Sequence, residues 1–293
     1  MATRVANLAC TNNSDTNFRA WINEIHNALI AFGWVQTADS GQINFSTVTR
    51  PTAIGIYQGF AVYHMNDSAQ STCAVFMRLD FGTSGNSADT PGLKVQICIG
   101  STNGSGTLTG NVCSQVIAQT NTGPNSNVFN VHSAGDAGSF RMNFWTGDVG
   151  GLGWTLVIER DQDSSGNDTT TGVTLLCAFP SAGNAITTTS QFLETAGGIG
   201  TQFTAWYAWL SGQSTQSGFG GVGVGPVRPV LGQLRNPMKT VLLASGADFP
   251  TYVTTPVTVY GVSRTYMVFH PQPGMNPALN IWNTANRVLL LWQ

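Results

Sequence analysis

Apolar positions near the start of the chain recur with the period of an α-helix. The stripe that follows the i, i+3, i+4, i+7 spacing consists of Phe18, Trp21, Ile22, Ile25, Leu29 and Phe32. Ser14 and Asp15 can cap the start of such a helix, and Gly33 can end it. The pattern predicts an amphipathic helix over residues 16–33 that packs against a sheet, with Trp21 and Leu29 in the core.

After Gln36 the pattern changes to short apolar runs that alternate with turn-forming residues. Strands are predicted at 54–65, 74–81, 93–99, 139–145, 154–160, 173–179, 238–244, 257–262 and 265–269. Gly, Asn, Ser and Asp fill most of the breaks, and a bend is expected at Ser263-Arg264. Many short strands with such turns predict a mainly β protein, an antiparallel β-sandwich or jelly-roll-like domain with one N-terminal amphipathic helix.

The chain shows no Pro/Ser linker or charge run that would divide it, so one β-rich domain is expected over residues 1–293. Residues 37–180 are expected to supply the main β-sandwich strands, and 226–293 the C-terminal strands that complete the fold. Residues 181–225 are predicted as an irregular, Gly-rich insertion. Within it, Phe203–Leu210 fits either a strand or a helical turn.

Charged residues make up only 9% of the chain, against about a quarter in ordinary soluble proteins. Only three Glu and two Lys occur, and the formal net charge is −2. Lys and Glu are depleted at subunit interfaces relative to free surfaces. The composition therefore favours a protein that assembles as many identical copies through largely uncharged contacts. Long Gly/Thr/Asn segments at 82–92, 100–127 and 211–225 are expected to be loops that reach neighbouring subunits. A secreted β protein with a Thr/Asn/Ser surface is the alternative.

Several partner classes find no support in the sequence. The Arg residues are scattered and the pI is near 6.0, so no nucleic acid is expected as a partner. No apolar run reaches the length of about 18–20 residues that crosses a membrane. The stretch from Met1 to Cys10 lacks a basic segment followed by an apolar core, so no secretory signal is expected. The cysteines are odd in number and widely spaced, which predicts reduced, structural thiols at Cys10, Cys73, Cys98, Cys113 and Cys177.

Candidate chemical motifs are incomplete. Glu159 and Asp161 suggest paired carboxylates, but acidic residues are scarce and no aromatic-lined cleft is evident. Asp161, Asp163 and Ser165 imitate half of a calcium loop whose twelfth position is Gly172 instead of Glu. The histidines have no short metal-ligand spacing; they are His26, His64, His132 and His270.

A glycine-rich run at 218–223 has the letters of a dinucleotide-binding loop, but Pro226 follows where that loop needs a helix. We therefore expect a non-enzymatic protein with no catalytic, cofactor-binding or metal-binding residues. Trp206, Tyr207 and Trp209 could stack on sugar rings; buried packing in a sheet or a subunit interface explains them equally well, and the interface is the favoured interpretation.

Several segments, in order along the chain, resemble a family of tailed-bacteriophage and prophage virion structural proteins, whose members are mostly unassigned. The segments are Ala31–Trp34, Gln36–Gln42, Tyr63–Asp67, Phe76–Gly82, Pro91–Gly100, Val157–Asp161, Asn236–Met238 and Tyr260–Tyr266. The resemblance covers about three quarters of the chain, with 181–225 outside it.

The resemblance implies a virion protein, made in the host bacterial cytoplasm, whose partners are copies of itself and other virion proteins. We expect a tail- or baseplate-associated structural subunit that assembles as a homo-oligomer. A head-decoration or collar protein is one alternative. A receptor-binding module for a host-surface glycan is another, although the heptads of a trimeric fibre neck are absent.

Overall fold

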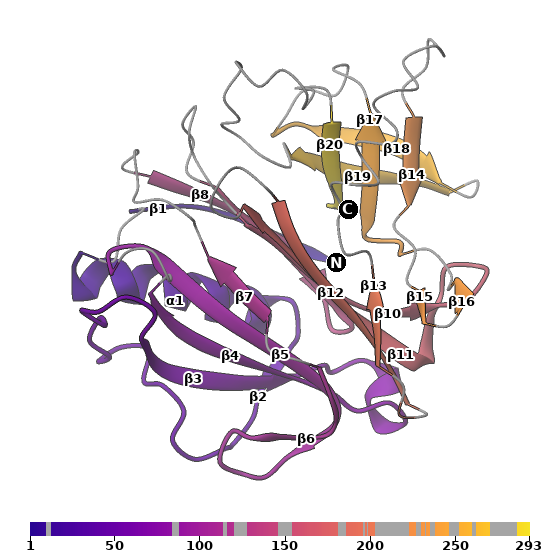
Figure 1. Ribbon diagram of the computed structural model, residues 1–293. Coiled ribbons are helices and arrows are strands. Elements are labelled where there is room, and N and C mark those ends of the chain that lie inside the picture. The colour runs from indigo at the N-terminus through magenta and orange to yellow at the C-terminus, as the bar shows by residue number, and fades with distance from the viewer. Residues whose placement is uncertain are drawn as a thin grey trace.

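The computed structural model describes most of the chain, and the molecule is mainly β (Figure 1). The described residues are 1–9, 13–83, 88–113, 116–119, 128–145, 154–180, 186–195, 197, 199–202, 223–226, 230–231, 233–234, 238–245, 252–259, 262–269 and 286–293. They form one N-terminal α-helix and three large antiparallel sheets with a two-stranded ribbon. None of the sheets built from these residues closes into a barrel. The prediction of a mainly β protein with one N-terminal helix is confirmed.

Helix α1 spans Asp15–Ala31, so its ends lie within two residues of the predicted 16–33. The Ser14 hydroxyl accepts a hydrogen bond from the Asn17 backbone N–H at 3.1 Å, which satisfies one of the free amides of the first turn. Gly33 follows the helix with φ +94°, a left-handed conformation that favours glycine. Trp21 and Leu29 are 1% and 0% exposed, so their predicted place in the core is confirmed.

The first sheet lies next to the helix in sequence and has six strands. In spatial order these are β2 (Val35–Gln36), β3 (Tyr57–His64), β4 (Val75–Thr83), β5 (Pro91–Thr102) and β6 (Leu108–Val112), with β7 (Val116–Gln119) also paired to β5. A short 3-10 helix, η1 (Ser68–Ser71), connects β3 and β4. Strand β4 alternates buried and half-buried positions from Val75 to Asp80, so one of its faces points into a core.

The second sheet has seven strands and combines the N-terminal strand with the middle of the chain. Its order is β1 (Ala2–Ala9), β8 (Val128–Asp136), β9 (Ser139–Trp145), β10 (Trp154–Gln162), β11 (Asp168–Pro180), β12 (Ile186–Glu194) and β13 (Ile199–Gln202).

The third sheet has five strands from the last third of the chain. Its order is β14 (Gly223–Pro226), β17 (Val241–Ser245), β20 (Asn286–Leu291), β19 (Val262–Phe269) and β18 (Thr254–Val259). The ribbon consists of β15 (Val230–Leu231) and β16 (Gln233–Leu234).

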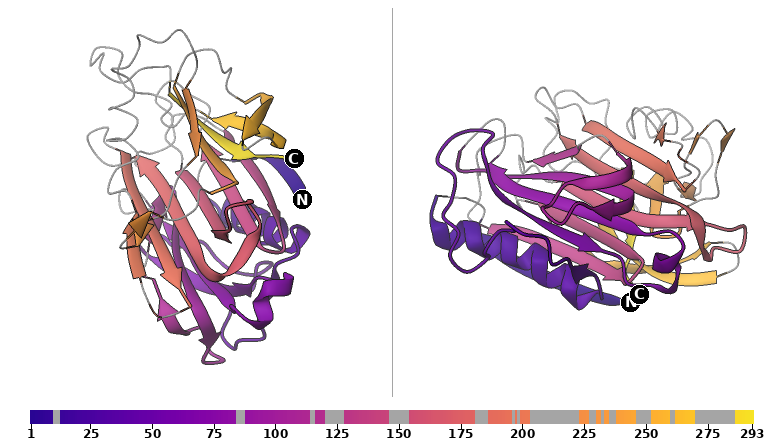
Figure 2. Two further views of the ribbon diagram at one scale, coloured as in Figure 1. Left: turned by 90° about the vertical axis from the view of Figure 1, so that its right-hand side faces the viewer. Right: turned by 90° about the horizontal axis from the view of Figure 1, so that it is seen from below.

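The seven-stranded sheet is the middle layer of the molecule, and both of its faces are covered (Figure 2). On one face, Leu156 and Ile158 of β10 belong to a large core shared with α1 and the six-stranded sheet. On the other face, Val157 packs with residues of the five-stranded sheet such as Val241 and Phe269. Every residue of β10 is therefore buried, as expected for a strand with a layer on each side.

Helix α1 covers the core beside β1 and β8, as both views of Figure 2 show. The Trp21 ring lies 5.8 Å from that of Phe81 in the six-stranded sheet, and the Phe32 ring lies 6.0 Å from that of Phe140 in the seven-stranded sheet. Gly135 makes the second approach possible, because a Cβ there would come within 2.6 Å of Phe32. The helix therefore joins the two sheets around one core.

Some predicted details are wrong. The bend expected at Ser263-Arg264 is absent, because both residues lie inside β19 and pair with Thr258 and Val257. The segment expected to be irregular contributes β12 and β13, and the predicted loop at 100–127 contributes β6 and β7. Thr-rich and Gly-rich strands lack the apolar alternation by which strands are recognised. Their pairing with an already formed strand supplies the missing stabilisation.

Candidate functional site

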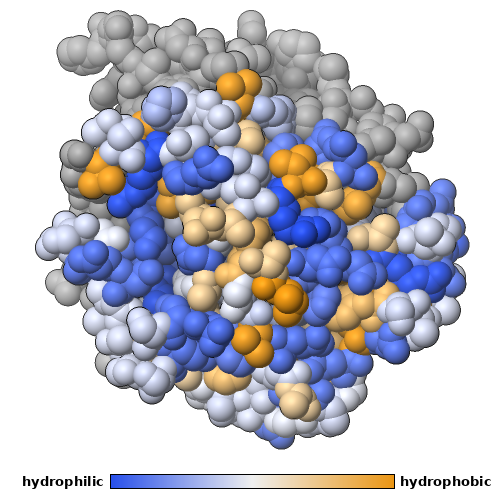
Figure 3. Space-filling view, turned by 180° about the vertical axis from the view of Figure 1, so that it is seen from behind, coloured by the Kyte–Doolittle hydropathy of each residue, from blue (hydrophilic) through white to orange (hydrophobic). Residues whose placement is uncertain are grey.

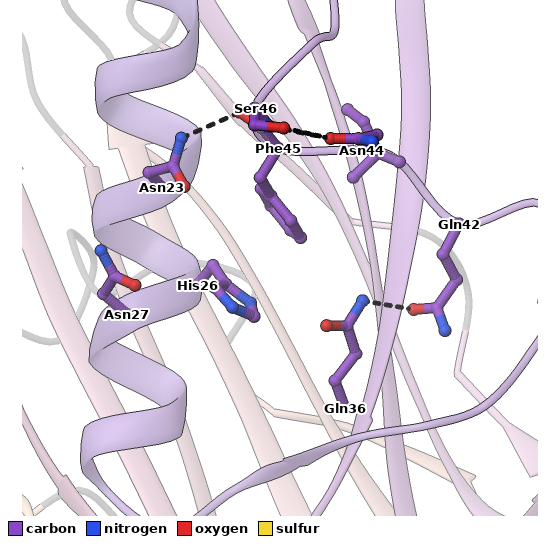
Figure 4. Close-up of a pocket in the computed structure, with 9 residues that line it drawn as sticks. Asn23, His26, Asn27, Gln36, Gln42, Asn44, Phe45 and Ser46 are labelled. Carbon is purple, nitrogen blue, oxygen red and sulfur yellow. Dashed lines mark hydrogen bonds between the residues drawn. The ribbon is translucent and has the colours of Figure 1, made fainter.

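A polar hollow lies between α1 and the chain that connects β2 to β3 (Figure 4). Its volume is about 590 Å³, and it is an open depression of the surface rather than an enclosed cavity. The residues that line it are Asn23, His26, Asn27, Gln36, Gln42, Ile43, Asn44, Phe45 and Ser46. Five of these nine carry carboxamides, and we call the hollow the amide pocket.

The helix wall of the amide pocket is formed by Asn23, His26 and Asn27, whose spacing places them on one face of α1. The Asn23 amide nitrogen donates to the Arg19 carbonyl at 2.7 Å and to the Phe45 carbonyl at 3.0 Å. These bonds tie the loop to the helix and leave the Asn23 side-chain oxygen unused. The exposed Asn27 amide has no hydrogen-bond partner among the described residues.

The loop wall is held by its own amides. The Asn44 side-chain oxygen accepts from the Ser46 backbone N–H at 3.0 Å and from its hydroxyl at 2.7 Å, which closes a tight turn. The Gln42 side-chain oxygen accepts from the Val62 backbone N–H at 2.8 Å and from the Gln36 amide at 3.0 Å. The Gln42 nitrogen donates to carbonyls of its own loop. The wall is therefore fixed before any ligand arrives.

An aromatic pair forms the inner part of the amide pocket. The Phe45 ring stacks on the His26 ring with centroids 4.4 Å apart and planes inclined by 28°. Burial lowers the pKa of His26, so its imidazole is neutral at pH 7. Burial also raises the pKa of Tyr63, whose hydroxyl lies 2.9 Å from the His26 Nδ1. When this hydroxyl donates to Nδ1, the His26 proton sits on Nε2 and is available as a donor.

The candidate carboxylate pair has other partners. The Glu159 carboxylate accepts from the backbone N–H groups of Lys239 at 2.7 Å and Thr240 at 3.1 Å, and also from the Thr240 hydroxyl. Burial raises the pKa of Glu159, which lies beneath the segment that leads into β17. Asp161 accepts from the Thr171 hydroxyl at 2.7 Å. Neither carboxylate lines the amide pocket.

The 161–168 turn is closed by its own hydrogen bonds. The Asp163 carboxylate accepts from the backbone N–H groups of Ser165 at 2.8 Å and Asn167 at 2.9 Å. The Asp168 carboxylate accepts from the Lys239 ammonium at 2.6 Å. The Asp161 and Asp163 carboxylates thus accept hydrogen bonds from donors within the protein. Within the described part of the chain, no group of three or more His, Cys, Asp and Glu side chains could hold a metal ion.

The described histidines and cysteines have buried or half-buried side chains. His64 bonds the Met65 carbonyl, and His132 lies between aromatic rings of the five-stranded sheet and its neighbours. The four described cysteines are buried free thiols: Cys73, Cys98, Cys113 and Cys177. Burial raises the pKa of Cys98 to about 12, which keeps this thiol protonated. Cys10, His270, the 206–209 aromatic group and residues 218–222 lie outside the described residues.

Sequence reasoning did not identify the amide pocket. Asn23 and Asn27 belong to the polar face of a helix, where amides are usually solvated, and the loop from Gln36 to Ser46 has no motif of a binding site. The available signal was the concentration of Asn and Gln beside one aromatic residue.

No protein-family model matches the chain, and no curated protein sequence is significantly similar to it. Among the helices formed by the described residues, none has the length and apolar character to cross a membrane.

Proposed function

We propose that this chain is a non-enzymatic structural subunit of a tailed-phage virion, associated with the tail or baseplate and assembled as repeated copies. The observation that carries the proposal is the use of buried and half-buried charge. Arg160 binds Asp67 at 2.5 and 2.8 Å, Arg4 binds Glu24 at 2.9 Å, and Glu159 binds the Lys239-Thr240 backbone. Each contact joins two layers of the fold. A catalytic site would instead direct such groups toward a cleft.

Arg141 shows the same use of buried charge. It is 1% exposed, and its guanidinium donates to the Leu291 carbonyl at 2.5 Å and the Ser139 hydroxyl at 3.0 Å, with Met1 sulfur as a further contact. Burial lowers its pKa to about 10, so it stays charged at pH 7. One arginine thereby fastens residues near both ends of the chain to the middle sheet. A fold held together by such interior contacts is suited to a permanent structural subunit.

The surface supports assembly through uncharged contacts. With 9% charged residues, polar and small side chains must form much of the surface. The large apolar side chains that are exposed in the described part lie scattered among polar ones, as Figure 3 shows for one face. Single exposed apolar residues are common on protein surfaces. The proposed contacts between copies do not require a large hydrophobic patch. Contacts between copies would therefore depend on backbone and amide hydrogen bonds, with little sensitivity to salt.

The finer architecture belongs to this proposal. The six-stranded and seven-stranded sheets share a core with α1, and we interpret them as a β-sandwich of jelly-roll-like type. The five-stranded sheet lies on the outer face of that sandwich. The virion setting is supported by the sequence resemblance of segments such as Tyr63–Asp67 and Val157–Asp161. In the structure these two segments meet through the Arg160–Asp67 ion pair.

The test is to purify tailed particles from a host that carries the coding sequence. Mass spectrometry of particles banded in a density gradient should find this chain in several copies per particle. Gold-labelled antibodies raised against the recombinant chain should mark the tail or baseplate. Label on the head or collar would correct the location. A chain that is absent from banded particles but present in the cell lysate would contradict the proposal.

A further inference from the structure

We infer that the amide pocket is a binding site for an uncharged, hydroxyl-rich ligand, a neutral saccharide. The inference goes beyond a structural role and concerns residues on α1 and in the 36–46 loop. The argument rests on the charge, the unused hydrogen-bonding groups and the fixed aromatic ring of the pocket.

The lining of the amide pocket carries no Asp, Glu, Lys or Arg. His26, its one titratable side chain, has a pKa lowered by burial and is neutral at pH 7. An anionic or cationic ligand would lose hydration there and gain no counter-ion. Apolar ligands are also poorly matched, because only Ile43 and Phe45 supply apolar surface. The ligand class that remains is polar and neutral.

Unused hydrogen-bonding groups line the hollow. Among the described residues, the Asn27 amide has no partner, and the side-chain oxygens of Asn23 and Gln36 accept no hydrogen bond. Carboxamides supply both donors and acceptors, and each sugar hydroxyl can act as either. The Asn23 and Gln36 nitrogens already donate to fixed protein groups, so their oxygens are held in place. Neighbouring hydroxyls of one sugar ring match such a mixed, oriented set.

The part of the Phe45 ring that lines the amide pocket can contact the C–H groups of a sugar ring. The ring is half-buried, with His26 stacked on it at 4.4 Å and Phe81 edge-on at 5.8 Å. Because these neighbours and the Asn44 turn fix the ring, little freedom is lost when a ligand binds. An aromatic ring beside oriented amides matches a ligand that has one apolar and one polar face.

Affinity at a single open pocket of this kind should be weak, with Kd on the order of 1 mM. If the chain is present in many copies on one particle, which rests on the proposed function, linked pockets gain about 10²–10⁴ in apparent affinity. Binding by the isolated chain does not depend on assembly. The two proposals can therefore fail separately.

The experiment uses saturation-transfer difference NMR on the recombinant full chain with four probes at about 10 mM. Three probes are neutral (maltotriose, cellotriose and tri-N-acetylchitotriose), and one is anionic (a hyaluronan tetrasaccharide). We expect transfer to at least one neutral trisaccharide and none to the anionic probe. The Asn27→Ala and Phe45→Leu variants should each reduce the transfer by fivefold or more, as should free monosaccharide in excess.

Matched controls separate a lost site from a lost fold. Asn66→Ala removes another exposed amide, and Phe76→Leu removes another half-buried phenyl ring that lies beside a histidine. Both should keep the wild-type transfer, and thermal melts will show whether each variant is folded. No transfer to any neutral probe overturns the inference, as does preferred binding of the anionic probe. Transfer that persists unchanged in folded Asn27→Ala and Phe45→Leu also overturns it.

Discussion

Glu159 and Arg160 are neighbours on β10, and their side chains leave the middle sheet on opposite faces. Glu159 accepts hydrogen bonds from the backbone of Lys239 and Thr240, at the start of the five-stranded sheet. Arg160 binds Asp67 and the Cys73 carbonyl beside the six-stranded sheet. Successive residues of a strand point to opposite sides, so two adjacent charged residues connect three layers of the molecule.

The Arg160–Asp67 pair should be strongly coupled. Arg160→Met leaves the half-buried Asp67 carboxylate without its partner, and we expect a loss of about 3 kcal/mol in unfolding free energy. Adding Asp67→Asn to that variant should cost less than Asp67→Asn costs alone. Urea denaturation of the double-mutant cycle measures this coupling.

The control for that cycle is the Arg50–Asp89 pair, whose aspartate side chain is 55% exposed. Arg50→Met should cost no more than about 1 kcal/mol, because solvent screens surface pairs. If Arg160→Met costs no more than Arg50→Met, the interlayer role of Arg160 is wrong.

Glu159→Gln should loosen the five-stranded sheet locally. The glutamine keeps the shape but offers one acceptor in place of a carboxylate that receives three hydrogen bonds, and we expect a cost of about 2 kcal/mol. In hydrogen exchange, the amides of Lys239 and Thr240 should lose protection, while amides of β4 and β5 keep theirs. Equal losses of protection in all sheets would indicate global destabilisation. That result would contradict a local role of Glu159 in holding the five-stranded sheet.

Stability should fall in acid through His132. The His132 side chain is 9% exposed and lies against the rings of Tyr252, Phe269 and Trp292. Burial lowers its pKa from 6.5 to about 4. Between these values the unfolded chain binds a proton that the folded chain does not, so stability is lost as the pH falls from 6.5 toward 4. This difference between the unfolded and folded pKa values corresponds to a loss of about 3 kcal/mol in unfolding free energy.

Urea midpoints measured at pH 7 and pH 4 test the role of His132. His132→Gln removes the titrating group, so its midpoints should differ less than those of the wild type. The carboxylates contribute equally to the pH dependence of both proteins. The comparison therefore isolates the contribution of the histidine. An identical acid-induced change in the variant would show that His132 does not titrate as described.

Helix α1 should be essential for the core. Trp21→Ala and Leu29→Ala each remove a fully buried side chain, and we expect losses of about 2–5 kcal/mol. Ile30→Ala is the control, because Ile30 lies on the same helix with 45% of its surface exposed. Its cost should stay within about 1 kcal/mol. Unchanged denaturation midpoints for the two core variants would show that the helix is peripheral.

The parts of the fold that the sequence predicted are those with strong local periodicity. The helix followed from the spacing of Phe18, Trp21 and Leu29 with a serine cap, and β9 followed from Ser139–Trp145. Strand β1 was not predicted because Arg4 stands among its inward positions Ala2, Ala6 and Leu8, and this arginine pairs with Glu24 on the helix. Tertiary contacts of that kind have no local signature.

The candidate site was harder to predict than the fold. Asn23 and Asn27 are polar residues on an exposed helix face, and Phe45 is one aromatic residue in a loop. Their meeting depends on the Asn23 bond to the Phe45 carbonyl and on the stacking of Phe45 over His26. Both contacts require the helix and the 36–46 loop to be placed by the core first. The spacing of residues in the sequence does not predict that placement.

The most direct test of the account is the area that each copy buries against its neighbours in the assembled particle. A cryo-electron microscopy map of intact particles, with this chain placed in the density, gives that area. The account predicts more than about 1,200 Å² of surface buried in each contact between copies, the size of specific interfaces, formed mainly by uncharged groups. Less than about 800 Å², the size of incidental packing contacts, would contradict it.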